Sequence, residues 1–162
     1  MIEEKIEIKI KRIKDVTFYV NENLYDPDPE KLMKIELNPL LGFKADENTV
    51  VLIIRVSFHY AGTELLPENT LLEIQVQNLY EINNVVGFVN DQNMIVLPEK
   101  SIISLLDLSI SHARALIAKN AAGTVYQDSL MPVFDAENAA RFFFPYMFYR
   151  PTPMENIIKE AD

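Results

Sequence analysis

Alternating hydrophobic and polar positions dominate the first half of the chain. In residues 5–13, Ile6, Ile8 and Ile10 alternate with charged side chains. A period of two is typical of a strand with one buried face. The alternation slips at Arg12-Ile13 and resumes as far as Val20, which predicts a β-bulge within one long strand.

Three further strands follow the same rule. The second begins at Met33, and we expect Pro39 and Gly42 to interrupt it. Residues 49–60 show the clearest alternation, and residues 70–82 repeat it. Because the connections are short, these segments predict an antiparallel meander with one covered face.

The hydrophobic period changes from two to about 3.6 after residue 97, and residues 101–122 predict a long helix. Pro98 suits its start and Gly123 its C-terminal cap. The first half is apolar nearly all round, so we expect a second subunit to cover one side. The predicted oligomer interface is the apolar stripe formed by Ile102, Leu106, Ile110, Ala113 and Ile117.

A short second helix is expected after an extended link, with Asp135 as its N-cap. It ends in an aromatic run over residues 142–149. The predicted fold class is α+β: a four-stranded antiparallel sheet, a long helix in the C-terminal half and a short second helix. We expect one domain over residues 1–150 and a flexible polar tail over residues 151–162.

Charge and composition narrow the classes of partner. The 162 residues carry a net charge of −9, whereas a protein that binds duplex nucleic acid usually presents a basic surface. The chain has no cysteine, and its first residues do not resemble a signal peptide. We also expect no apolar run long enough to span a bilayer. These features predict a cytoplasmic protein without membrane insertion.

Candidate catalytic and metal-binding residues are few. His59 and His112 lie apart in different elements, and we interpret both as ordinary surface or interface histidines. The sequence has neither a Gly-Xaa-Ser-Xaa-Gly elbow nor a glycine-rich phosphate loop. The acids in residues 26–30 alternate with prolines and lack calcium-loop spacing, which favours a solvated loop. We therefore expect no enzyme activity, no cofactor and no metal.

Two segments hold more apolar mass than one small core needs, namely residues 85–97 and residues 142–149. One interpretation is core plus oligomer interface. The other is a groove for extended apolar peptide, because large apolar patches on soluble proteins usually mark binding sites. Methionine among aromatic side chains gives an adaptable surface for varied partners.

The order and spacing of three parts of the sequence resemble the SecB family of protein-export chaperones. The first is residues 8–18, with Arg-Ile, Lys-Asp and Thr-Phe elements. The second is the strand pair 50–60 and 71–79. The third is residues 112–124, which end in Gly-Thr and are followed by Leu-Met-Pro-Val-Phe-Asp at residues 130–135.

This resemblance implies a dimer of dimers, a homotetramer in which long helices lie between two enlarged sheets. It also implies binding of non-native preproteins without ATP and transfer to the SecA motor. By position, the peptide groove would be lined by Leu79, Tyr80, Val85, Val86, Phe88 and Phe134. Asp15 and Glu73 would serve SecA-type docking, although Tyr19 stands where the family has a second acid.

The leading functional hypothesis is an ATP-independent holdase that binds unfolded or extended apolar polypeptide, with protein export as one setting. Some SecB-like proteins serve antitoxins instead. The alternative is therefore a dedicated module for one protein partner, such as an antitoxin, or for a small apolar ligand.

Overall fold

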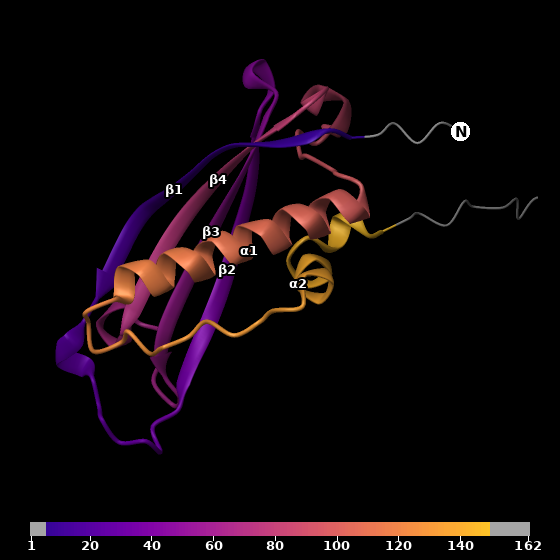
Figure 1. Cartoon of the computed structure of the whole chain (residues 1–162). Coiled ribbons are helices and arrows are strands. Elements are labelled where there is room, and N and C mark those ends of the chain that lie inside the picture. Colours follow the sequence, from indigo (N-terminus) through magenta and orange to yellow (C-terminus); the bar gives the residue numbers. More distant parts are fainter. Residues whose placement is uncertain (1–5, 150–162) are drawn as a thin grey trace, which may run out of the picture.

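The computed structural model describes residues 6–149 and consists of one sheet with helices on one side (Figure 1). The strands are β1 (Ile8–Val20), β2 (Met33–Lys44), β3 (Thr49–Tyr60) and β4 (Leu72–Ile82). All neighbours are antiparallel, in the order β1-β4-β3-β2. The predicted four-stranded antiparallel sheet is confirmed, and the predicted tail, residues 151–162, lies outside the described residues.

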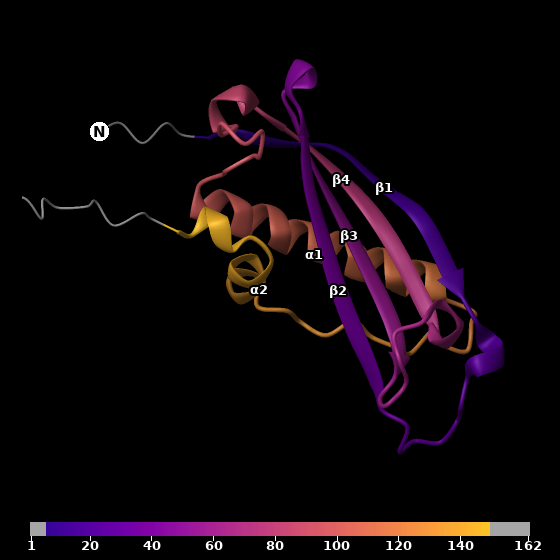
Figure 2. The ribbon, with the colours of Figure 1, turned by 180° about the vertical axis from the view of Figure 1, so that it is seen from behind.

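Two helices follow the sheet, α1 (Glu99–Ala121) and α2 (Ala136–Phe143). The long α1 lies diagonally across one face of the strands in Figure 1, and the view from behind in Figure 2 shows the strands in front of it. Within residues 6–149, neither α1 nor α2 lies on the opposite face of the sheet. The predicted α+β arrangement of one long and one short helix is confirmed.

The predicted break in the second strand is wrong. β2 runs without interruption through Pro39 and Gly42, which pair with Ile54 and Val51 of β3. β2 is an edge strand, so a proline there costs no ladder hydrogen bond if its nitrogen points outward. The bulge predicted in β1 is confirmed, because its register against β4 shifts between Ile10 and Arg12 and again between Asp15 and Thr17.

The hydrophobic core lies between α1 and the covered sheet face. The side chains that β3 and β4 direct toward α1 are buried, among them Leu52, Ile54 and Ile74. The helix contributes the stripe that the sequence marked as an oligomer interface: Ile102, Leu106, Ile110, Ala113 and Ile117 are all at most 2% exposed in the single chain.

The assignment of that stripe to a subunit contact is therefore corrected. A 3.6-residue period identifies the buried side of a helix but does not say what buries it, and here the chain's own sheet does. The outer side of α1 carries mostly small or polar residues, such as Ser104, Ser111 and Ala115, with Leu108 as its exposed large apolar residue.

Polar contacts also join α1 to β4. The Tyr80 hydroxyl lies 2.7 Å from Ser109 Oγ, and both groups are buried. His112 Nδ1 lies 2.7 Å from Asn78 Oδ1, while Asn78 Nδ2 donates to the Leu52 carbonyl at 3.2 Å. These hydrogen bonds are directional, so they fix the position of α1 along β4. The apolar packing is not directional and would not fix this position alone.

α1 is long and apolar enough to cross a membrane by length and composition alone. The expectation that no segment reaches this length was therefore wrong. A core helix of a soluble protein passes the same test, and the apolar stripe of α1 packs on the sheet.

Candidate functional site

The structure separates the residues that were expected to line one peptide groove. Tyr80 and Val85 are completely buried in the core, so they offer no surface to a peptide in this conformation. Leu79 precedes Tyr80 in β4 and therefore points to the opposite, helix-free face of the sheet. The expected lining is corrected accordingly, because consecutive strand residues cannot share a groove.

The remaining three predicted groove residues lie on connecting segments. Val86 is exposed and Phe88 is half-buried in the turn Val85–Phe88 that follows β4. Phe134 is half-buried on the link between α1 and α2 and packs against the core. Binding by these three residues stays a prediction.

Large apolar side chains are exposed on the link and on α2. Leu130, Val133 and Phe142 are 75%, 88% and 77% exposed. The link is extended, and in Figure 1 it runs below α1 toward α2. Sequence reasoning included Phe142 in an aromatic run but missed Leu130 and Val133. A sequence feature that could have identified Leu130 and Val133 is that they are apolar residues in a segment predicted to form neither helix nor strand.

Polar contacts hold the link in place. Arg114 of α1 donates from Nη2 to the Pro132 carbonyl at 3.0 Å, and Ser129 Oγ lies 3.7 Å from the sulfur of Met33 in β2. The buried Met131 anchors the segment in the core. The link is thus fixed at several points, while Leu130 and Val133 remain exposed.

α2 is a short helix with a well-formed start. The carboxylate of Asp135 accepts a hydrogen bond from the Asn138 backbone N–H at 3.0 Å, as the sequence predicted for its N-cap. Arg141 pairs with Glu137 at 2.9 Å, and its guanidinium lies 4.5 Å from the ring centre of Phe148. These contacts hold the turn of α2 that presents Phe142.

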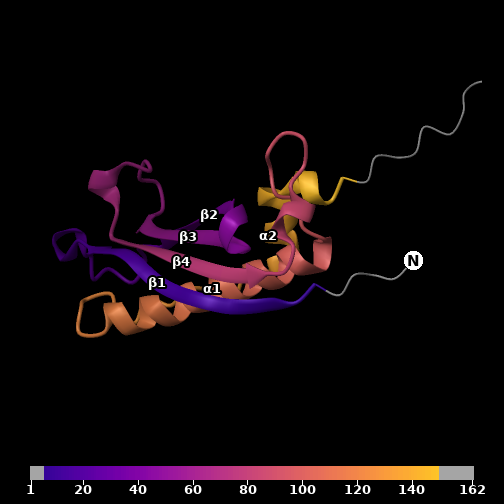
Figure 3. The same cartoon turned by 90° about the horizontal axis from the view of Figure 1, so that it is seen from above.

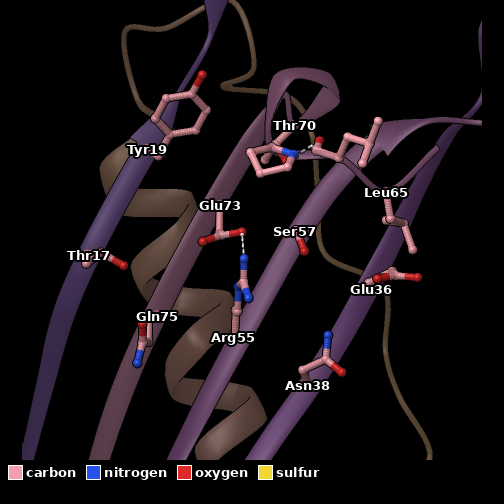
Figure 4. A pocket seen from close by; sticks show the side chains of 12 residues that line it. Thr17, Tyr19, Glu36, Asn38, Arg55, Ser57, Leu65, Thr70, Glu73 and Gln75 are labelled. Atoms are coloured by element: carbon pink, nitrogen blue, oxygen red, sulfur yellow. Dashed lines mark hydrogen bonds and ion pairs between the residues drawn. The ribbon is translucent and has the colours of Figure 1, made fainter. Parts of the chain in front are cut away.

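The helix-free sheet face carries a separate, polar hollow of about 720 Å³ (Figure 4). Side chains of all four strands form its floor, and the β3–β4 connection forms one wall with Leu65, Leu66 and Pro67. The other lining residues are Thr17, Tyr19, Glu36, Asn38, Arg55, Ser57, Thr70, Glu73 and Gln75. Most of the lining residues carry amide, hydroxyl or charged groups, but apolar atoms make up about half of the exposed lining, so the hollow suits a ligand that combines hydrogen-bonding and apolar groups.

An ion pair occupies the floor of the hollow. Arg55 Nη2 lies 2.8 Å from Glu73 Oε2, as Figure 4 shows. The hydrogen bond and the charge of Glu73 raise the pKa of the Arg55 guanidinium, which stays protonated at any physiological pH. The negative charge of Glu73 is therefore already compensated by Arg55 of the same chain.

The two acids expected to serve SecA-type docking do not form one surface. Glu73 faces the hollow, whereas Asp15 accepts a hydrogen bond from Asn120 of α1 at 3.2 Å, on the helix side of β1. A single docking surface that contains both acids is therefore not formed within one chain. The sequence could not show this, because the second bulge of β1 directly follows Asp15 and changes which side chains share a face.

The described residues contain no group of three or more histidine, cysteine, aspartate or glutamate side chains placed to hold a metal ion. His112 is engaged with Asn78, and His59 is buried rather than at the surface.

Comparison with known proteins identifies the fold. No protein-family model and no curated protein matches the sequence. Among solved structures, the chain matches the SecB-like chaperone Rv1957 of Mycobacterium tuberculosis in complex with a ChAD peptide from the HigA1 antitoxin Rv1956. The TM-score is 0.53 at 7% identity, over 78% of this chain and 90% of that one.

The fold is SecB-like. This result agrees with the sequence resemblance and does not rest on shared residues, because 7% identity carries no motif. The similar structure is that of a chaperone in complex with a peptide.

Proposed function

We propose that this protein is an ATP-independent holdase that binds unfolded or extended apolar polypeptide. The observation that carries the proposal is the exposure of Leu130, Val133 and Phe142 on two consecutive segments, the link and α2, of a SecB-like fold. Exposed apolar groups of this size cost solubility and are typical of a binding surface. Binding to a client's apolar segments would keep the client from aggregating by mass action.

The client is a polypeptide with accessible apolar side chains. Unfolded preproteins fit this chemistry, and so does an antitoxin-like segment, since the similar chaperone was solved with an antitoxin peptide. An extended client gains backbone hydrogen bonds at a sheet edge and side-chain contacts at apolar positions. We place this activity in the cytoplasm, with no cofactor.

The test is suppression of aggregation. Light scattering of a chemically denatured substrate, diluted into buffer without nucleotide, should fall when the protein is present at up to equimolar amounts. The triple variant Leu130→Ser, Val133→Ser and Phe142→Ser should lose this effect. Leu65→Ser, an exposed leucine in the β3–β4 connection, is the matched control and should retain it. A correctly folded wild-type protein that leaves scattering unchanged would overturn the proposal.

The second candidate is a module dedicated to one protein partner or to one small apolar ligand. The peptide-bound SecB-like structure favours this alternative equally, because one specific peptide occupies it. Binding measurements separate the two. A holdase binds many unrelated unfolded chains with similar affinity, whereas a dedicated module binds one partner and ignores the others.

Assembly and export belong to the same proposal. A dimer of dimers would extend the binding surface over several chains, and native mass is the measurement that decides it. Transfer to SecA has less support in this chain, since the two acids expected for docking lie on different faces and both accept hydrogen bonds.

A further inference from the structure

The polar hollow on the helix-free face of the sheet has a floor of two adjacent rows of side chains. Listed from β2 to β1, the first row is Glu36, Ser57, Glu73 and Tyr19, and the second is Asn38, Arg55, Gln75 and Thr17. All eight line the hollow. Because neighbouring strands lie about 4.8 Å apart and the rows about 7 Å apart, the floor measures roughly 14 Å by 7 Å. This floor and the volume of about 720 Å³ suit a small molecule.

Glu36 differs from the other partly buried acids of the described chain because it has no charge partner. Four acids in residues 6–149 are half-buried: Asp26, Glu36, Glu73 and Glu99. The other three each form an ion pair, with Lys31, Arg55 and Arg141 respectively. Glu36 forms none within these residues. A partly buried carboxylate is less well hydrated than an exposed one, so a cation placed beside it gains more.

The cations closest to Glu36 in the sheet do not compensate it. Arg55 lies in the next row, diagonal to both Glu36 and Glu73, and it bonds Glu73 at 2.8 Å. Lys34 lies two residues before Glu36 on the same face of β2, but it is exposed and forms no ion pair with Glu36. The lining therefore holds two carboxylates and one guanidinium, which leaves one negative charge.

Neutral oxygen acceptors surround Glu36. Ser57 is its partner on β3, Asn38 follows it on β2, and both side chains face the hollow in Figure 4. A primary ammonium group has three N–H donors and no acceptor. One carboxylate, one hydroxyl and one amide oxygen match these three donors.

An apolar wall stands next to these acceptors. Leu65 and Leu66 of the β3–β4 connection are 55% and 41% exposed, and with Pro67 they line the hollow. In Figure 4, Leu65 lies on the β2 side together with Glu36, whereas Tyr19 lies on the β1 side. A ligand held at Glu36 can therefore place an apolar group against the wall.

Other classes of ligand fit this lining less well. A calcium or magnesium ion needs about six oxygen ligands, and the described residues contain no group of three or more acids or histidines placed to bind one. An anion would be repelled by the remaining negative charge of the lining and by the net charge of −9. The lining and the charge favour an organic cation.

We propose that the hollow binds a small organic amine. Its ammonium group pairs with Glu36 and donates to Ser57 and Asn38, and its apolar part lies against Leu65 and Leu66. The site lies on the sheet face opposite to α1, and it is separate from the exposed apolar side chains of the link and α2.

Titration of the full chain with 2-phenylethylamine at pH 7, followed by amide NMR, tests the proposal. The amide signals of Ser57, Leu66 and Gln75 should shift and reach saturation. The neutral analogue 2-phenylethanol has the same shape but no charge, and it should not saturate these shifts over the same concentration range.

Two glutamate variants separate a specific site from general attraction to an acidic protein. Glu36→Gln should weaken amine binding about tenfold or more, because a charge-assisted hydrogen bond is lost. Glu81→Gln is the matched control, since Glu81 is an exposed glutamate without an ion pair on the same face of β4, outside the hollow. It removes the same charge and should leave the affinity unchanged.

Leu65→Ser tests the apolar wall. This variant should weaken amine binding severalfold and, as stated above, retain suppression of aggregation. The two results together would show that the amine site and the client surface are distinct.

Several results would overturn the proposal. Absence of saturable shifts in the folded protein excludes an amine site. Equal affinity for 2-phenylethanol would show that charge does not select the ligand. Equal weakening by Glu36→Gln and Glu81→Gln would assign binding to the overall negative charge. If Nα-acetyl-lysine methylamide binds as tightly as 2-phenylethylamine, the hollow accepts the lysine side chain of a polypeptide rather than a small amine.

Discussion

The buried hydrogen bond between Tyr80 and Ser109 is a single contact that couples the sheet to the long helix. Tyr80→Phe keeps the ring in the core but leaves the Ser109 hydroxyl with one fewer partner. A buried polar group left unsatisfied costs about 1–3 kcal/mol, so the free energy of unfolding should fall by that amount.

Urea denaturation measures this effect. The double variant Tyr80→Phe, Ser109→Ala should lose less than the sum of the two single losses, because it removes both partners. Strictly additive losses would mean that the two hydroxyl groups do not interact in the folded protein.

His112 gives the fold a defined pH dependence. Burial lowers the pKa of its imidazole in the folded state, so the unfolded chain binds the proton more readily. The stabilising contribution is present above the unfolded pKa, near 6.5, and is lost as pH falls through the folded pKa. The free energy of unfolding should therefore decrease on acidification below about pH 6.5.

Urea denaturation of His112→Gln between pH 5 and 8 isolates this contribution. The variant should show a flatter profile than the wild-type protein, since glutamine does not titrate in this range. Equal slopes in the two proteins would assign the pH dependence to other groups.

The sequence predicted which residues of a strand share a face. It did not predict what each face packs against. The period of two separated Leu79 from Tyr80 in the alternation itself, yet the family resemblance grouped both in one groove. Only the position of α1 shows that Tyr80 is core and that Leu79 faces away from it. Likewise, the helical period found Ile102 and Leu106 but left open whether a sheet or a subunit covers them.

Among the elements, α2 depends on its N-cap because it has only eight residues. Asp135→Ala removes the acceptor for the Asn138 N–H and should cost about 1 kcal/mol of local helix stability. Phe142 would then be presented less rigidly, and client binding should weaken more than global stability. Asp135→Asn retains an acceptor and should restore most of the binding.

Amide hydrogen exchange of α2, measured beside aggregation suppression, checks this prediction. Faster exchange confined to α2, together with weaker suppression, is the expected pattern. Unchanged client binding despite faster exchange would show that α2 does not present the client surface.

It was also easier to predict that a helix or strand exists than to predict whether it continues without a break. The start of α2 followed from one aspartate, and the long helix ended near Gly123, whose φ of +80° is the left-handed conformation that glycine adopts readily. The second strand failed as a prediction because the meaning of Pro39 depends on whether its strand lies at the edge or in the middle of the sheet. Strand order is a tertiary property that local sequence does not contain.

At the scale of the whole molecule, β1 is the edge that offers apolar contact to another chain. Ile10, Ile13 and Val16 are all exposed along it. If the protein assembles through this edge, Ile10→Lys together with Ile13→Lys should reduce the native mass to that of the single chain. Lys34→Glu on β2 serves as the control and should not change it.

Native mass spectrometry or light scattering gives the answer, with circular dichroism to verify folding. A mass that stays the same in the folded double variant would place the contact elsewhere, for example on the outer side of α1.

Pro39 has a consequence for how such assemblies grow. A sheet with two competent edges can add copies of itself at both ends, and repeated addition leads to open-ended fibres. If the Pro39 nitrogen points outward, the middle of the β2 edge lacks one backbone donor, so strand addition there is penalised. The β1 edge then remains for pairing with another copy. Two copies joined through β1 leave no competent edge, so no further copy is added. If the protein is the holdase proposed above, this asymmetry of the two edges would keep it from polymerising with itself.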